Sequence, residues 1–199
     1  GIGNITELTH ADTAGMNAIL FGIASELDIN YALCTQVSEH CNKAIIEGNF
    51  ARRIMHTTKQ YNMPPKDISN KLLNLHERKP FPYSTEELKE MWGNVKDKNY
   101  RIYVNTEGIH VFNNKNFHTE KDATELYQYL DIKNDDGHAY YLGMELAKAQ
   151  IAFQLGKRYD QDEMLKWGCS VDVSDEDIMK FKTAGHTMRK LKTKKEDKK

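Results

Sequence analysis

The sequence predicts a mixed α/β protein in which βα units precede a smaller α+β domain, and three observations carry this prediction. Residues 1–61 alternate short apolar runs with stretches of helical periodicity, as in βα units with parallel strands. Prolines then interrupt the helical pattern in 61–67 and 77–84. A hairpin pattern and a long helical pattern follow. We therefore expect a first domain over 1–76, a linker over 77–83, an α+β domain over 84–175 and a basic, helical or disordered tail over 176–199.

The composition narrows the class of protein. Of the 199 residues, 39% are hydrophobic, and 28 basic residues against 29 acidic ones give a net charge of −1. This balance is typical of a globular protein and creates no overall field for a nucleic acid or an anionic membrane. The apolar runs are shorter than the roughly 20 residues that span a bilayer. Three cysteines favour a reducing cytoplasm over a disulfide framework. The closing basic run lacks interleaved aromatic residues, which favours a solvated tail over a nucleic-acid contact.

The first segment is predicted to alternate strand and helix. Residues 1–6 (GIGNIT) and 29–35 (INYALCT) are short apolar runs typical of buried strands, although length alone does not exclude a helix for the second. Apolar residues recur at helical spacing over 13–27, and Ser38 is expected to cap a second helix. Two such units cannot bury both faces of a sheet, so we expect this segment to be the end of a larger α/β fold.

Several motifs carry a resemblance to a known family. The stretches GIGNITEL, GMNAIL and CTQVS resemble the last two βα units of the pterin-binding barrel family, which contains dihydropteroate synthases and pterin-dependent methyltransferases. The stretch GHAYYLGMELAKAQIAFQLGKRYDQDE looks like the C-terminal domain of unknown function that archaeal dihydropteroate synthase-like proteins carry behind such a barrel. Together the resemblances cover about residues 1–168. They imply that Gly1 lies in the seventh strand of a truncated TIM-type barrel whose first six units are absent.

The resemblance also implies a ligand and a site. The ligand is a reduced pterin of the folate or methanopterin type, acting as substrate or cofactor. Asn4 matches an asparagine of the methyltransferase branch that hydrogen-bonds the pterin ring. Without the resemblance, the favoured role of Asn4 is to cap the turn between strand and helix. The Ser-Arg-Lys and Arg-x-His motifs of the synthases are missing, which weakens the case for pyrophosphate displacement. Because TIM barrels gather their chemistry at strand ends, the expected substrate-binding residues are Asn4, Glu7, Asp12, Asn17, Thr35, Gln36 and Ser38.

Some of these polar residues have a simpler interpretation. For Asp12, a helix cap is favoured over a ligand contact, and for Asn17 a hydrogen bond to a neighbouring loop. Gln36 stands where the archaeal relatives are expected to have glutamate, which removes an acid–base role. The group Cys34, His40 and Cys41 lacks the spacing of a structural zinc site, so no metal is predicted.

The second segment is predicted to be α+β. Ser84 and Glu87 form a capping-box pattern, residues 99–114 a hairpin, and Thr119 is expected to cap a helix over 120–130. A long helix is expected over about 137–155. Its i,i+3 pair Glu145–Lys148 would contribute about 0.2–0.5 kcal/mol as a surface ion pair. A partly buried His–Glu–Lys set could transfer protons or bind an anion, although a structural role is favoured. The candidates in this domain are His138, Glu145, Lys148, Tyr159 and Asp162.

Two hypotheses of function follow. In the first, the intact protein binds a reduced pterin and acts in its biosynthesis or in one-carbon transfer; no catalytic residue is assigned. In the second, the chain is a non-catalytic pterin-binding module, or a docking or oligomerisation module. The expected partners are the pterin and the missing barrel strands, and self-association is left open. Binding to a membrane or to a nucleic acid is disfavoured.

Overall fold

The chain folds into two compact units. A computed structural model describes residues 1–133 and 135–171; the predicted tail over 176–199 lies outside them. The first unit contains Gly1–Asn74 together with residues 167–171, and the second contains Leu75–Lys166. Residues 167–171 fall within the range expected for the second domain, yet the Cys169 amide donates to the Lys71 carbonyl at 2.8 Å in the first unit. In the part of the chain that the structure describes, no helix is long and apolar enough to cross a membrane.

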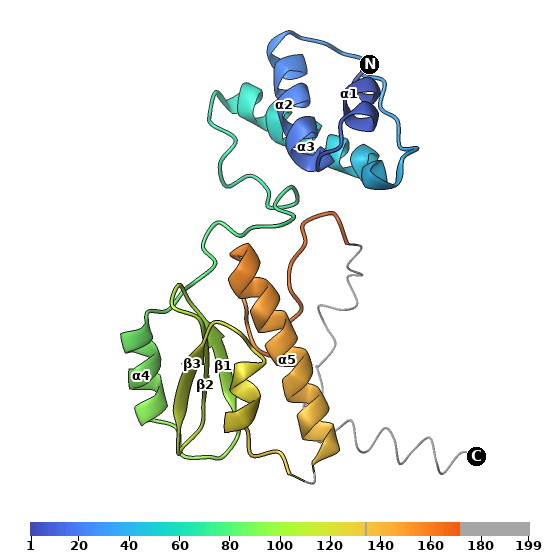
Figure 1. The fold of residues 1–199 in the computed structure, drawn as a ribbon. Coiled ribbons are helices and arrows are strands. Elements are labelled where there is room, and N and C mark those ends of the chain that lie inside the picture. Colours follow the sequence, from blue (N-terminus) through green and yellow to red (C-terminus); the bar gives the residue numbers. More distant parts are fainter. Residues whose placement is uncertain (134, 172–199) are drawn as a thin grey trace, which may run out of the picture. The chain divides into compact units, whose positions relative to one another are not determined.

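Helices make up the regular structure of the first unit (Figure 1). The long helices α2 and α3 pack against each other. Helix α3 ends where Asn62 adopts a left-handed conformation (φ 48°), two residues before the Pro64–Pro65 pair. The predicted proline boundary is confirmed. The elements are α1 (Gly3–Leu8), α2 (Thr13–Glu26), η1 (Glu39–Cys41, a 3-10 turn) and α3 (Ala44–Tyr61).

Both strands predicted for the first unit are wrong at the level of secondary structure. Residues 3–8 form α1, and 29–35 has no regular secondary structure. A strand requires a ladder of backbone hydrogen bonds to a neighbour. Here the amides of Ile2 and Gly3 both donate to the Leu33 carbonyl, at 2.9 and 3.1 Å, and no β-ladder continues from them among the described residues. The expected N-cap Ser38 precedes η1 instead, and α3 begins only at Ala44.

Several large apolar side chains of the first unit are exposed to solvent. The side chains of Ile19, Ile23 and Leu27, one helical turn apart, are 67, 51 and 67% exposed. Tyr31 and Leu33, in the segment that follows α2, are exposed as well. The four-residue spacing places Ile19, Ile23 and Leu27 on one side of α2. An exposed apolar patch is typical of an interaction site. The helical periodicity predicted for this stretch is confirmed, but its apolar face is not buried within the unit.

The second unit is an α+β domain, as expected. Its sheet is antiparallel in the order β1-β2-β3, and the predicted hairpin pairs Val104 with Ile109. Gly108 is required at its turn, because a Cβ there would lie 2.6 Å from the Glu120 carbonyl. The predicted helix cap at Thr119 is wrong, because Thr119 lies in a third strand. Only a 3-10 turn forms within the range predicted as a helix, 120–130. The elements are α4 (Thr85–Gly93), β1 (Arg101–Val104), β2 (Ile109–Phe112), β3 (Phe117–Glu120), η2 (Glu125–Tyr129) and α5 (Asp136–Leu155).

Helices lie on both sides of this sheet (Figure 1). Side chains alternate between the faces of a strand, so Ile102 and Val104 of β1 share one face, and α5 packs against this strand. The Phe117 ring, in β3, lies 5.6 Å from the Trp92 ring of α4. Consequently β2 is buried at all four positions. The predicted capping box is confirmed, with Ser84 and Glu87 bonded reciprocally at the start of α4.

The covered sheet buries a histidine. His110 is fully buried; its Nδ1 lies 2.8 Å from the Thr119 hydroxyl, and its Nε2 has no partner in the described chain. Burial lowers the pKa of His110, helped by Lys89 and opposed by Glu107. The unfolded chain, with a histidine pKa of about 6.5, therefore binds a proton at mildly acidic pH that the folded chain does not.

We expect the second unit to lose stability as the pH falls below about 7. The melting temperature, measured across this range, should fall less steeply in His110→Gln, whose amide does not titrate but can still bond Thr119. His56→Gln, at an exposed position of the first unit, serves as the control. Equal pH slopes for wild type and His110→Gln would contradict the prediction.

Candidate functional site

Glu7 connects helix α1 to the loop that contains three of the predicted site residues. Its carboxylate accepts hydrogen bonds from the amides of Val37 (2.7 Å) and Ser38 (2.9 Å). The Ser38 hydroxyl, the two amides and the Thr35 hydroxyl together lower the pKa of Glu7 to about 2. A carboxylate held by this many donors is ionised throughout the physiological range. The structure therefore brings Glu7, Thr35 and Ser38 together around one fixed negative charge.

Close backbone packing also joins the N-terminus to this loop. A Cβ on Gly3 would overlap the Thr35 hydroxyl, so only glycine fits there. The Thr6 carbonyl lies 3.1 Å from both His40 Nε2 and Cys41 Sγ. Asn4 is on the same short helix; its side chain is exposed and bonds no described residue. An amide placed in this way is open to a ligand.

The other predicted residues have different surroundings. Asp12 occupies the N-cap position of α2, but its exposed side chain makes no cap hydrogen bond. Gln36 accepts a long hydrogen bond from the Ile45 amide at 3.4 Å. Asn17 is buried and donates to the Ala44 carbonyl at 3.2 Å, which joins α2 to α3 rather than to a loop. Asn17 thus belongs to the helix interface.

A buried carboxylate that the sequence analysis missed lies at this helix interface. Glu47 of α3 is only 3% exposed. It accepts hydrogen bonds from the Thr13 hydroxyl and from the amides of Asn17 (3.4 Å) and Asn74 (3.3 Å). The available signal was its position, three residues after Ala44 and four before Ala51, on the apolar side of the helix. Three donors, two from α2 and one from Asn74, compensate its burial.

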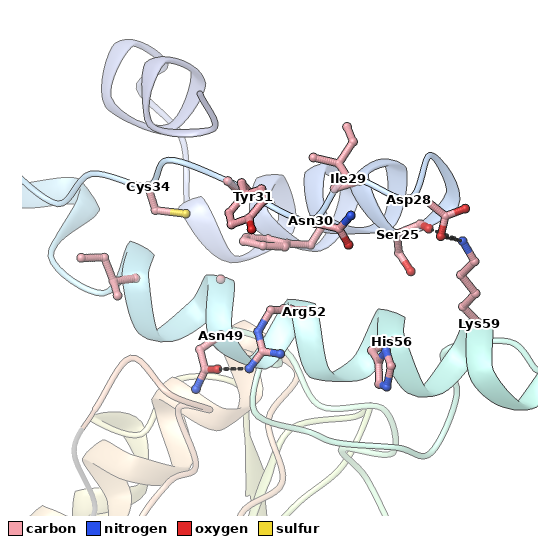
Figure 2. A pocket seen from close by; sticks show the side chains of 15 residues that line it. Ser25, Asp28, Ile29, Asn30, Tyr31, Cys34, Asn49, Arg52, His56 and Lys59 are labelled. Carbon is pink, nitrogen blue, oxygen red and sulfur yellow. Dashed lines mark hydrogen bonds and ion pairs between the residues drawn. The ribbon is translucent and has the colours of Figure 1, made fainter.

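A groove of about 560 Å³ opens between α3 and the segment that follows α2 (Figure 2). Arg52, His56 and Lys59 succeed one another along α3 on this side, at a spacing of four and three residues that was readable in the sequence. Lys59 Nζ binds Asp28 Oδ1 at 2.7 Å, and Arg52 donates to Asn49 Oδ1 at 3.0 Å. The excess of basic groups suits an anionic ligand. None of the predicted site residues lines this groove.

In the second unit, four of the five predicted residues form one network. Glu145 is 4% exposed and accepts from the Tyr159 hydroxyl at 2.7 Å and from the Asp162 amide at 3.3 Å. Lys148 Nζ lies 2.5 Å from its other oxygen. The predicted ion pair is thus present, but its expected surface position is wrong for Glu145, because residues 159–162 cover that side of α5. Burial, together with Glu145, raises the pKa of Tyr159.

His138 stands apart from this network. Its ring lies 6.0 Å from the Tyr141 ring and 6.4 Å from the Tyr100 ring, and it shares no hydrogen bond with Glu145. The predicted His–Glu–Lys set is thus not assembled as a proton relay. The carboxylate of Glu145 serves instead to hold 159–162 against α5. Over residues 1–133 and 135–171, no cluster of three His, Cys, Asp or Glu side chains is arranged to hold a metal ion.

Comparison with known proteins identifies an archaeal relative of this chain. An uncharacterized protein of Methanocaldococcus jannaschii, MJ0107, is 30% identical over 185 residues, which cover 81% of this chain and 35% of the relative. This chain therefore spans about a third of the relative's length. No family model matches the chain, and no solved structure does.

Proposed function

We propose that the first unit is the end of a pterin-binding TIM-type barrel, and that the intact protein binds a reduced pterin in its biosynthesis or in one-carbon transfer. The observation that carries this proposal is the close approach of the backbone at Ile2 and Gly3 to that at Leu33 and Thr35, although neither segment is a strand in this chain. The Ile2 and Gly3 amides bind the Leu33 carbonyl, and Gly3 lies against Thr35. The last two strands of a barrel are neighbours whose ends meet at one edge, where TIM barrels carry their chemistry.

The uncovered apolar surface supports the same arrangement. Ile19, Ile23 and Leu27 on α2, with Tyr31 and Leu33 beyond it, are exposed in this chain. Six preceding βα units would supply the neighbouring strands and helices that such surfaces pack against. The archaeal relative is long enough to contain such units, since the matched region is only 35% of its length.

Asn4 is the proposed contact to the pterin ring. Its amide supplies one donor group and one acceptor, so it can bond a ring nitrogen in either protonation state without becoming charged. Glu7 supports the site by holding the 35–38 loop through the Val37 and Ser38 amides. In this proposal Thr35 and Ser38 line the neighbouring strand end.

We expect Asn4→Ala to weaken pterin binding at least tenfold, or about 1.4 kcal/mol. The measurement is calorimetric titration of the protein in its natural full length with a dihydropterin and with a methylated tetrahydropterin. Asn70→Ala, at an exposed position of the same unit, is the matched control and should bind as the wild type does.

The outcomes separate the alternatives. Preference for the methylated pterin, with transfer of its methyl group to an acceptor, would favour one-carbon transfer over biosynthesis. Binding without any turnover would favour a non-catalytic pterin-binding module. A folded full-length protein that binds neither pterin would overturn the proposal and leave the docking or oligomerisation module.

A further inference from the structure

We propose that a groove of the second unit binds a planar heterocycle that carries an anionic group, the chemical class of a mononucleotide. The groove encloses about 660 Å³, within the size range of small-molecule sites, roughly 300–1,000 Å³. Its walls come from residues 98–100 ahead of β1, the 113–116 turn, the exit of η2, the first turns of α5, and Gln161–Asp162. This inference is independent of the pterin proposal, which concerns the first unit.

Aromatic rings form one wall of the groove. The His138 ring is inclined by 28° to the Tyr100 ring and by 28° to the Tyr141 ring. Both tyrosine hydroxyls are already engaged: that of Tyr100 accepts from the Asp131 amide at 2.6 Å, and that of Tyr141 donates to Asp162 at 2.8 Å. The rings are therefore fixed before a ligand arrives, and near-parallel ring faces suit a flat heterocycle.

Polar groups for the edge of such a heterocycle lie beside these rings. Asp162 Oδ1 accepts from Tyr141, which leaves Oδ2 without a partner in the described chain. A carboxylate oxygen of this kind accepts from a ring N–H or an exocyclic amine. The ring nitrogens of His138 likewise bond no described residue. Asp162 has a left-handed backbone (φ 67°), a conformation that aspartate and asparagine tolerate.

Hydrogen bonds from neighbouring elements hold the segment Gln161–Asp162 in place. The Asp162 amide donates to buried Glu145 at 3.3 Å. Gln161, the preceding residue, accepts from the Ile102 amide at 2.9 Å and donates to the Tyr141 hydroxyl at 2.8 Å. These bonds tie the 161–162 wall to both the sheet and α5. The Glu145 network therefore acts as the support of the groove rather than as its reactive part.

Two lysines are the cationic groups of the groove, whose lining also contains the carboxylates of Asp131, Asp135 and Asp162; the anionic group of the ligand would contact the lysines. Lys98 and Lys115 both line the groove, and the hydrogen bond from the Asn114 amide to the Asp97 carbonyl, at 3.1 Å, brings their segments together. Neither lysine forms an ion pair with a described residue. Asn116 also lines the groove, and its side-chain amide bonds no described residue. Two lysines and an amide donor lining one groove can bind a phosphate or a carboxylate.

The test is calorimetric titration of the full chain with three probes: guanosine 5′-monophosphate, guanosine and ribose 5-phosphate. We expect the nucleotide to bind about tenfold more tightly than either part alone. Lys115→Gln should weaken the nucleotide about fivefold and leave guanosine unchanged. Asp162→Asn, which keeps a residue that tolerates the left-handed conformation, should weaken both guanosine and the nucleotide.

Lys89→Gln, an exposed lysine of α4 outside the groove, is the matched control. Three outcomes would overturn the proposal. The first is no nucleotide binding at millimolar concentration by a chain whose circular dichroism shows it folded. The second is ribose 5-phosphate binding as tightly as the nucleotide, which would indicate an anion contact without a ring site. The third is equal weakening by Lys115→Gln and Lys89→Gln.

Discussion

Glu47→Ala is expected to lower the free energy of unfolding of the first unit by about 3 kcal/mol. The substitution removes the one acceptor shared by Thr13, Asn17 and Asn74. Thr13 and Asn17 are buried, at 3 and 1% exposed, so water cannot readily replace the carboxylate. Leaving the buried Thr13 hydroxyl without this acceptor costs roughly 1–3 kcal/mol, Asn17 keeps only its bond to the Ala44 carbonyl, and the lost volume adds a cavity.

Hydrogen–deuterium exchange resolved by segment is the measurement, because it reports each unit separately. Amides of α2 and α3 should exchange faster in Glu47→Ala, while those of the second unit keep their rates. Glu47→Gln, which retains an acceptor oxygen, should fall between Glu47→Ala and wild type. Glu39→Ala, at an exposed position of the same unit, is the control; a Glu47→Ala variant as protected as this control would refute the interpretation.

Glu145→Ala is expected to have a comparable effect on the second unit, about 3 kcal/mol. Tyr159 is 4% exposed, and its hydroxyl would lose its acceptor. The Asp162 amide would lose its acceptor at the same time, whereas Lys148 would lose its ion pair but keep the Glu163 carbonyl at 3.0 Å. Removing one member of a buried charge network costs more than the network contributes, because the remaining groups stay desolvated.

Denaturant unfolding of Glu145→Ala, Tyr159→Phe and the double variant measures this coupling. The double variant should lose less stability than the sum of the two single variants, since each removes the same hydrogen bond. Glu90→Ala, on the exposed side of α4, is the control for losing a glutamate. Strict additivity of the two substitutions would show that the hydrogen bond between Tyr159 and Glu145 contributes nothing.

Glu145→Ala also bears on the proposed groove. If Glu145 supports Asp162, the variant should weaken guanosine 5′-monophosphate as Asp162→Asn does, even though Glu145 does not line the groove. This effect would separate a positioning role from a purely structural one, because a change in overall stability alone would leave the affinity of the folded fraction unchanged.

Local signals in the sequence determined the elements that depend on neighbouring residues. The apolar period over 13–27, the Ser84–Glu87 capping box, the hairpin at Gly108 and the helix end before Pro64 were all predictable. Each depends on propensity, capping or turn geometry within a few residues. Glu7, Thr35 and Ser38 were named as one site through a family resemblance, and the structure places them in contact.

Strand pairing, the burial of two glutamates and the groove of the second unit depend on residues far apart in the sequence, and only the tertiary structure decided them. The runs at 1–6 and 29–35 have strand-like composition, yet a strand requires a ladder of backbone hydrogen bonds, and none forms at these runs among residues 1–133 and 135–171. Glu47 and Glu145 look like surface glutamates in the sequence; they are buried because Asn74 and Tyr159 reach them from 27 and 14 residues away. The groove of the second unit is assembled from five separate segments. The sequence thus determined local structure, whereas burial, strand pairing and the binding surfaces follow from long-range contacts that no local pattern encodes.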